Sequence, residues 1–145
     1  MRLVIQTIEH AILSVDHTIK ASIHNGAIVY VGFTHGDDAE KVKKMVDKLL
    51  SLRIYPDDLG KTNRSIQDFQ GSILLVPNFT LYGDVSASRR PSFTQALPSL
   101  MAEAMFQSFI DYARSMYPNI EHGVFGADMH IDVAHQGPFT MVLEA

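Results

Sequence analysis

Short apolar runs, many of them β-branched and alternating with polar residues, occupy the first third of the chain and predict extended strands. Four such runs are separated by turn-forming residues: 3–8, 12–15, 19–23 and 27–33. The pairs between them include Asp16-His17 and Asn25-Gly26, and an Asn-Gly pair between two strand-like runs is a strong hairpin signal. We therefore expect this part of the chain to form an antiparallel meander.

Two later segments carry apolar residues at helical spacing. The first spans about 38–52, with Asp37 as the expected N-cap and Glu40 as the acidic residue three positions further on. The second has Ser99 as its expected cap and runs to about Tyr117. Each helix has one apolar stripe that we expect to pack on the sheet: Ala39, Val42, Met45, Val46, Leu49 and Leu50 in the first, and Met101, Met105, Phe109, Ala113 and Met116 in the second.

The remaining apolar runs complete the sheet. The run 72–76, apolar at every position after Ser72, predicts a central strand buried on both faces, and Pro77 ends its regular pairing. A polar connector with short extended pieces fills 53–70, and two final strands, about 129–134 and 139–143, flank Gly137-Pro138. The whole pattern predicts an α/β fold, a single domain over residues 1–145 with a mixed, largely antiparallel sheet and two main helices packed on it.

Composition narrows the class of protein. The chain has 145 residues, of which 46% are hydrophobic and 19% charged, and this is typical of one globular domain. No apolar run is long enough to cross a membrane, and the N-terminus lacks the pattern of a secretory signal, so we expect a cytoplasmic protein with no membrane partner. The absence of cysteine excludes disulfides, thiolate zinc sites and cysteine nucleophiles.

The net charge of −4 gives the protein no overall positive field, so DNA is not an expected partner and any contact with RNA must be local. The candidate local patch is Ser88-Arg89-Arg90-Pro91, with Lys61 and Arg64 in another loop. The lysines of the first helix fit a solvated helix face.

Motifs of common enzyme classes are missing, including the serine nucleophile elbow, the phosphate-binding loop and the dinucleotide glycine fingerprint. His130, Asp132 and His135 suggest a metal cluster, but strand alternation gives His135 the opposite parity to the other two. We therefore expect neither a metal nor a cofactor.

The segment Pro77-Asn78-Phe79-Thr80-Leu81 lies where a strand ends. Because Pro77 disrupts pairing, we expect the amides of Asn78, Phe79 and Thr80 to lack sheet partners and to form an oxyanion hole, which stabilises acyl-transfer transition states without a catalytic triad. The Thr80 hydroxyl is an alternative nucleophile, although no base lies near it in the sequence.

Several stretches in order along the chain resemble the D-aminoacyl-tRNA deacylases. They are Leu52-Arg53-Ile54, Gly60-Lys61 with Asn63, Ser65 and Gln67-Asp68, Phe79-Thr80-Leu81-Tyr82, Arg89-Arg90-Pro91-Ser92-Phe93, Phe125-Gly126-Ala127-Asp128-Met129 and Gly137-Pro138. The resemblance extends over nearly the whole chain and is specific as a set. It implies an editing enzyme that hydrolyses the ester between a wrongly attached D-amino acid and the terminal adenosine of tRNA. The same enzyme is expected to remove misplaced glycine.

The resemblance also implies a homodimer with a site that spans two subunits. In this family a cis Gly-Pro peptide of one subunit enters the pocket of the other, where its carbonyls recognise the amino group and exclude L-side chains. Carried onto this chain, Phe79 and Thr80 are expected to be catalytic through their amides, assisted by the 2′-hydroxyl of the tRNA. Substrate binding is expected of Asn78, Met129, Gly137 and Pro138.

Several positions depart from the family pattern, including His135-Gln136, which replace a more usual Asn-Asp or similar pair. Pro77 and Asn78 replace a serine and a glutamine, and Thr7 replaces an arginine that supports the Gly-Pro loop. A paralogue in animals, with relaxed chirality and a trans Gly-Pro peptide, shares the proline but has alanine where this chain has Phe79. Two alternatives therefore stand beside the deacylase: an editing hydrolase of relaxed or altered chirality, and a noncatalytic module that binds acyl-tRNA. We expect the Gly137-Pro138 peptide to be cis.

Overall fold

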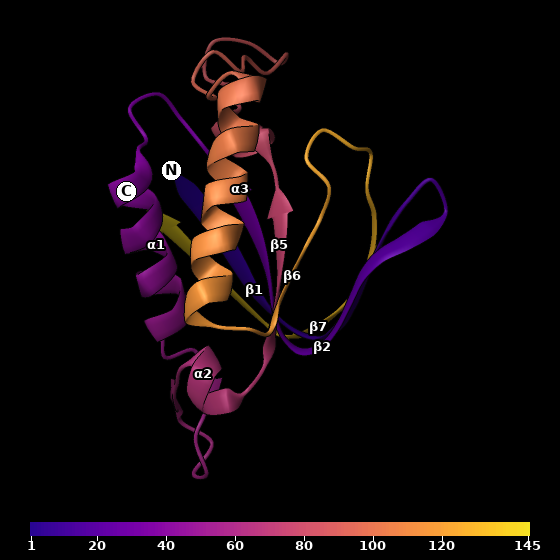
Figure 1. Cartoon of the computed structure of the whole chain (residues 1–145), viewed down its shortest axis with the longest axis vertical. Coiled ribbons are helices and arrows are strands. Elements are labelled where there is room, and N and C mark those ends of the chain that lie inside the picture. Colours follow the sequence, from indigo (N-terminus) through magenta and orange to yellow (C-terminus); the bar gives the residue numbers. More distant parts are fainter.

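A computed structural model describes residues 1–137 and 139–145. A five-stranded mixed sheet with strand order β6-β5-β2-β1-β7 forms its centre (Figure 1). The strands are β1 (Arg2–Val15), β2 (Thr18–Gly32), β5 (Ser72–Pro77), β6 (Ile120–His122) and β7 (His130–Glu144). β1 pairs antiparallel with β2 and with β7, whereas the shorter β2–β5 and β5–β6 pairs are parallel. The predicted mixed, largely antiparallel α/β fold is confirmed.

The first two strands form one long hairpin, so the predicted meander is wrong. The turn is at Asp16 and His17, whose φ angles of 49° and 62° are those of a tight hairpin turn. Asn25-Gly26 lies inside β2 instead. A Cβ on Gly26 would lie 1.8 Å from the carbonyl oxygen of Ser72, so this glycine permits the close approach of β5 to β2.

Two long helices, α1 (Ala39–Ser51) and α3 (Ser99–Met116), cover one face of the sheet (Figure 1). Both ranges agree with the prediction, but both predicted caps are wrong. Asp38 caps α1 by accepting a hydrogen bond from the Lys41 amide at 2.8 Å. Asp37 is occupied by the N-terminus, and Ser99 is already the first residue of α3, after Pro98.

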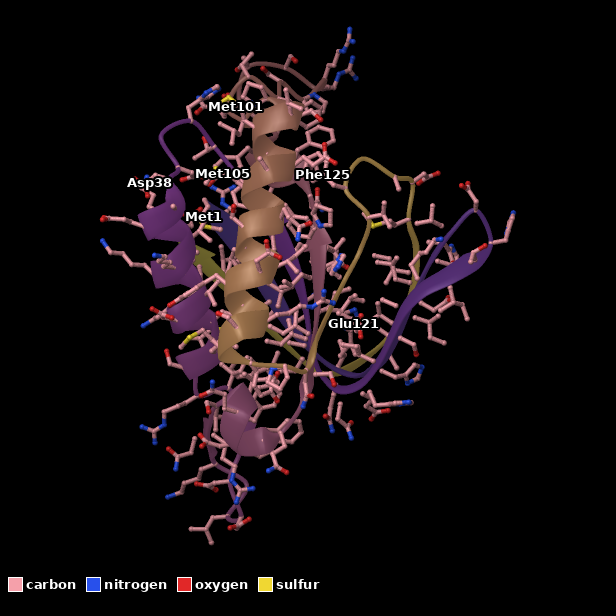
Figure 2. The ribbon with its side chains drawn as sticks, in the orientation of Figure 1. Met1, Asp38, Met101, Met105, Glu121 and Phe125 are labelled. Carbon is pink, nitrogen blue, oxygen red and sulfur yellow. The ribbon has the colours of Figure 1, made fainter. Side chains whose placement is uncertain are left out.

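The buried stripe of α3 differs from the predicted one. Phe109 and Ala113 are buried as expected, but Met101 and Met116 are 58% and 50% exposed, and Figure 2 shows Met101 at the outer end of the helix. The helix is apolar over more than half its circumference, so two stripes were compatible with its sequence. The sheet contacts the stripe that brings a second phenylalanine and an isoleucine inward: Ala102, Phe106, Phe109, Ile110 and Ala113.

Two apolar clusters lie on opposite faces of the sheet, and β5 contributes to both. Ile73 and Leu75 pack beneath the helices, and Leu74 and Val76 pack in the cluster on the other face. The prediction of a strand buried on both sides is therefore confirmed, and Pro77 is its last paired residue. The second cluster lies mainly between the distal part of the β1–β2 hairpin and β5.

The connector between α1 and β5 contains the predicted short extended pieces, β3 (Tyr55–Pro56) and β4 (Thr62–Arg64). It also contains a one-turn helix, α2 (Ile66–Phe69), which was not predicted from the sequence pattern. Ser65 and Asp68 form a capping box at its start, and the hydrogen bonds from Ser65 hold the pKa of Asp68 below its usual range. No helix in the described part of the chain has both the length and the hydropathy needed to span a bilayer.

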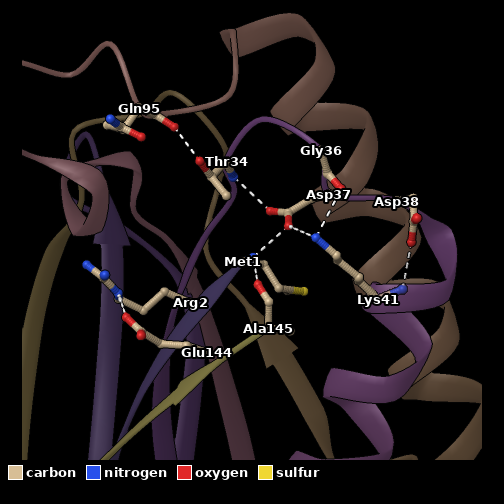
Figure 3. A network of polar contacts seen from close by, with 10 residues as sticks. All are labelled: Met1, Arg2, Thr34, Gly36, Asp37, Asp38, Lys41, Gln95, Glu144 and Ala145. Carbon is tan, nitrogen blue, oxygen red and sulfur yellow. Dashed lines mark hydrogen bonds and ion pairs between the residues drawn. The ribbon is translucent and has the colours of Figure 1, made fainter.

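The two ends of the chain meet beside α1 (Figure 3). The buried α-ammonium of Met1 lies 2.6 Å from Oδ1 of Asp37 and donates a hydrogen bond to the carbonyl oxygen of Ala145 at 3.0 Å. Lys41 Nζ lies 3.6 Å from the same Oδ1, and the other oxygen of Asp37 accepts from the amide of Thr34 at 2.7 Å. This ion pair fixes β1 and the end of β7 against the start of α1.

Candidate active site

A cavity of about 360 Å³ opens where the parallel strands β2 and β5 end. Ligands of open sheets commonly bind beyond the carboxyl ends of parallel strands. Its walls come from the end of β2, the turn after β5, the start of α3 and the loop that contains Phe125, which Figure 2 shows beside α3. Most of the lining side chains are apolar: Val31, Phe33, Pro77, Phe79, Phe93, Leu97 and Phe125.

The turn after β5 is a 3-10 helix, η1 (Phe79–Tyr82), with Asn78 as its cap. The Asn78 amide donates to the carbonyl oxygen of Val31 at 2.8 Å, and the Thr80 amide donates to Oδ1 of Asn78 at 3.1 Å. The expectation that all three amides lack sheet partners is therefore wrong for Asn78, which bonds to β2, whereas the Thr80 amide has a side-chain partner in its own turn. The Phe79 amide is the first of the helical turn, a position where the turn itself provides no acceptor.

The Thr80 hydroxyl donates to the same oxygen of Asn78, at 2.5 Å. A side-chain amide oxygen orients a hydroxyl but is too weak a base to activate it. The Phe79 ring, 56% exposed, meets Phe93 edge to face, with ring centroids 5.0 Å apart. This geometry favours a backbone function for η1 over a threonine nucleophile.

Arg2 holds the far end of η1, which the sequence analysis did not foresee. Its guanidinium donates a hydrogen bond to the carbonyl oxygen of Leu81 and lies 5.0 Å from the centre of the Tyr82 ring. Arg2 also pairs with Glu144 at 2.5 Å, so the end of the sheet is tied to this turn (Figure 3). Burial, with a smaller contribution from Asp37, raises the pKa of Tyr82 to about 12.

Gly137 lies in a wide bulge of β7. Gln6 pairs with Thr140 and Ile8 pairs with His135, so residues 136–139 lie opposite Thr7 alone. The predicted pair of final strands is therefore one strand with an interruption. Gly137 has a φ of +115°, which a residue with a side chain rarely adopts, and the Thr7 hydroxyl donates to the carbonyl oxygen of Gln136 at 2.7 Å. Pro138 lies outside the described residues, so the expected cis peptide stays a prediction.

Met129 lies near Pro77, next to Gly123, but it does not line the cavity at the ends of β2 and β5. It lines a second, more polar cavity of about 420 Å³ at the tip of the β1–β2 hairpin, together with Ser14, Asp16, His17, Asp128 and His130. Of the predicted site residues, Asn78 and Phe79 line the cavity at the ends of β2 and β5, which we call the β2–β5 cavity, and Thr80 is next to them. Met129 and Gly137 are absent from the described lining of this cavity. His130 and Asp132 share a strand face as expected, 3.5 Å apart, and the described residues contain no cluster suited to a metal ion.

A family model described as D-Tyr-tRNA(Tyr) deacylase matches residues 4–144. The chain belongs to this family. The match confirms the identification from sequence motifs, and it covers every residue discussed above except Arg2 and those at the two chain ends.

Relatives within the deacylase family match the chain over its full length. A D-aminoacyl-tRNA deacylase of Clostridium acetobutylicum is 38% identical over 145 residues, which is 100% of this chain and 97% of the relative. A D-aminoacyl-tRNA deacylase of Exiguobacterium sibiricum is 40% identical and covers 99% of both chains.

Solved structures agree with the fold. One titled c-Myc DNA Unwinding Element Binding Protein is 34% identical, with a TM-score of 0.95, and the match covers 100% of this chain and 99% of the other. Another, described as a probable eukaryotic D-amino acid tRNA deacylase, has a TM-score of 0.88 at 18% identity and covers 98% and 97%. At 18% identity, the second match is evidence for a shared fold and not for a shared activity.

Proposed function

We propose that this protein is a D-aminoacyl-tRNA deacylase, which hydrolyses the ester between a D-amino acid and the terminal adenosine of tRNA in the cytoplasm. Water attacks the ester carbonyl, the carbonyl oxygen takes up negative charge, and the adenosine oxygen leaves with a proton. The products are the free amino acid and tRNA. The observation that carries the proposal is an apolar cavity with a helical turn, η1, in its wall, in a chain of this family.

The cavity suits the terminal adenosine. Four phenylalanines contribute to its lining, Phe33, Phe79, Phe93 and Phe125. Stacking of a base on an aromatic side chain contributes about 1–3 kcal/mol and requires no particular charge on the protein. A protein of net charge −4 can therefore bind the end of a tRNA through this cavity.

The Phe79 amide is the proposed donor to the developing oxyanion. A single donor of this kind contributes about 2.7–4 kcal/mol to transition-state stabilisation. The Thr80 amide is a second donor only after substrate displaces Oδ1 of Asn78 from it. The substrate's own 2′-hydroxyl assists the proton transfers, since Thr80 has no base beside it.

We further propose a homodimer in which the bulge of one subunit completes the site of the other. Support comes from the position of Gly137 on edge strand β7, away from the described lining of the cavity in its own chain. The same strand exposes 54% of Val142 and 36% of Phe139, as expected of an interface. In this dimer the carbonyls of Gly137 and Pro138 accept hydrogen bonds from the substrate ammonium, and Met129 contacts substrate only through the assembled site.

The test is deacylation of matched D- and L-aminoacyl-tRNA. We expect rapid release of D-amino acid, slow release of glycine and no release of L-amino acid. Faster turnover of the L-substrate would favour the alternative editing hydrolase with altered chirality, motivated by Pro77, Asn78 and Thr7. Binding of both substrates without turnover would support the other alternative, a noncatalytic module that binds acyl-tRNA.

A matched pair of glycine variants tests the bulge. Gly137→Val forces a side chain into a φ of +115° and is expected to abolish deacylation. Gly60→Val imposes comparable strain, at a φ of +75°, in the distant connector and is expected to retain activity. Equal activities of the two variants would show that Gly137 is not part of the site.

A further inference from the structure

The loop between η1 and α3 is exposed but internally ordered. The amides and carbonyls of Asp84 and Ser92 bond to each other in both directions at 2.8 Å, which closes residues 85–91 into a loop. Within it, the carboxylate of Asp84 accepts from the amide of Ser86 at 2.8 Å, and these hydrogen bonds keep the pKa of Asp84 below its usual range. Ser88 Oγ donates to the carbonyl oxygen of Arg90 at 2.7 Å.

The base of this loop forms part of the rim of the β2–β5 cavity. Phe93 follows the Asp84–Ser92 bridge directly, lines the cavity and contacts Phe79. Two further contacts hold the next residues in place: Thr34 Oγ1 donates to the carbonyl oxygen of Gln95 at 2.5 Å (Figure 3), and a bridge joins Thr34 to Ala96. Figure 1 shows the loop at the start of α3, the same end of the helix that contributes to the cavity.

Arg89 and Arg90 lie in this loop, and both are exposed. Neither forms an ion pair with a residue in the described part of the chain, whereas Arg2, Arg64 and Arg114 each pair with a carboxylate. The carboxylate of the same loop is already bonded to Ser86. Two exposed guanidinium groups without a carboxylate partner among the described residues therefore lie in the loop that leads to the cavity residue Phe93, in a protein that is negative overall.

The proposed substrate supplies anions at this position. When the terminal adenosine occupies the cavity, the strand that precedes it must leave past the rim, with one phosphate for each nucleotide. A guanidinium group binds phosphate through two parallel hydrogen bonds and remains charged at all physiological pH values. We propose that Arg89 and Arg90 bind backbone phosphates of the tRNA acceptor strand next to the terminal adenosine. This inference rests on the proposed function and names the surface through which the RNA is held.

The test compares two substrates, D-aminoacyl-tRNA and a D-aminoacyl ester of adenosine that has no phosphate. The double variant Arg89→Gln/Arg90→Gln is expected to lose about tenfold in kcat/KM on the tRNA at low salt, the scale of two phosphate contacts. Its activity on the adenosine ester is expected to be unchanged. The salt dependence of log kcat/KM on the tRNA should become shallower by about 1.4, at about 0.7 for each single-strand phosphate.

Lys44→Gln/Lys48→Gln is the control, since it removes the same charge from the exposed face of α1. An equal loss in both double variants would overturn the proposal in favour of a general effect of net charge. Unchanged turnover of tRNA by the arginine variant would also overturn it, as would an equal loss on both substrates, which would place the defect in the cavity.

Binding of an acceptor-stem RNA that carries no amino acid, measured by fluorescence anisotropy, tests the same surface without catalysis. Weaker binding by the arginine variant than by the lysine variant is expected even if the wild type hydrolyses neither ester. Absence of hydrolysis by the wild type would refute the proposed function, but weaker binding by the arginine variant would still support the RNA-binding surface. Equal binding by the two variants would refute the proposal that Arg89 and Arg90 bind RNA.

Discussion

Replacement of Thr7 by valine tests whether the bulge of β7 is held by one hydrogen bond. Valine keeps the shape of threonine and removes the hydroxyl that donates to the carbonyl oxygen of Gln136 at 2.7 Å. Thr7 is only 7% exposed, so water replaces the lost donor poorly. Thr7 is the residue of β1 between Gln6 and Ile8 and therefore lies opposite this bulge.

The size of the effect follows from these contacts. A typical hydrogen bond contributes about 0.5–1.5 kcal/mol net, and a partly buried carbonyl left without a donor costs about 1–3 kcal/mol. We take about 1–2 kcal/mol for Thr7→Val, which lowers the ratio of ordered to disordered bulge by about 5- to 30-fold if the bulge alone responds. Since Gly137 is proposed to recognise substrate, kcat/KM for D-aminoacyl-tRNA should fall by up to the same factor.

The assay is deacylation by Thr7→Val, Thr7→Ser and Thr140→Val, with urea unfolding of each. The serine variant keeps the hydroxyl and should retain most activity. Thr140→Val removes an exposed hydroxyl that bonds only to the Gln6 side chain, at 3.2 Å, and should behave like the wild type. Wild-type turnover by Thr7→Val would refute the reasoning, and equal losses in Thr7→Val and Thr7→Ser would assign the effect to the lost packing of the methyl group.

Three further predictions concern catalysis, the buried ion pair and acid stability. Thr80→Ala should keep substantial deacylase activity, because its hydroxyl bonds only to Asn78; near-complete loss in a folded variant would support a nucleophile. Asp37→Asn should lower the free energy of unfolding in urea by about 3–5 kcal/mol, since it leaves the buried Met1 ammonium without its counter-charge; a loss under 1 kcal/mol would contradict this. The folded state lowers the pKa of Asp68, so its stabilising contribution is full above its unfolded value near 4 and is lost as the pH falls through the lower folded value. The urea midpoint of the wild type should therefore fall more than that of Asp68→Asn between pH 6 and 3, and parallel curves would exclude this contribution.

Local signals predicted the elements well where the cause of the structure was local. Both long helices have nearly the predicted bounds, and the buried strand 72–76 is in place. Asn25-Gly26 was wrongly predicted to be a hairpin turn, because the requirement for glycine there comes from the close approach of Ser72, almost fifty positions further along the chain. The turn belongs to Asp16-His17, a pair with a weaker sequence signal.

The same distinction separates the site residues that were found from those that were missed. Asn78 and Phe79 line the β2–β5 cavity, as expected from the motif to which they belong. Arg2 acts on η1 from the opposite end of the sequence, through Leu81 and Tyr82, and no spacing rule connects these positions. Sequence also gave no sign that Oδ1 of Asn78 would engage the Thr80 amide, because that contact depends on the turn that Asn78 itself caps.

The departures at Thr7 and Asn78 are compatible with a site made from backbone groups. Such a site requires a particular course of the chain, and different side chains can impose the same course. Thr7 holds the bulge through the carbonyl of Gln136, and Asn78 caps the turn that presents the Phe79 amide. Substitution at these positions is therefore weaker evidence for a changed reaction than it would be in a catalytic triad. Gly137 is different, because its φ of +115° is itself part of the proposed geometry and a residue with a side chain cannot easily supply it.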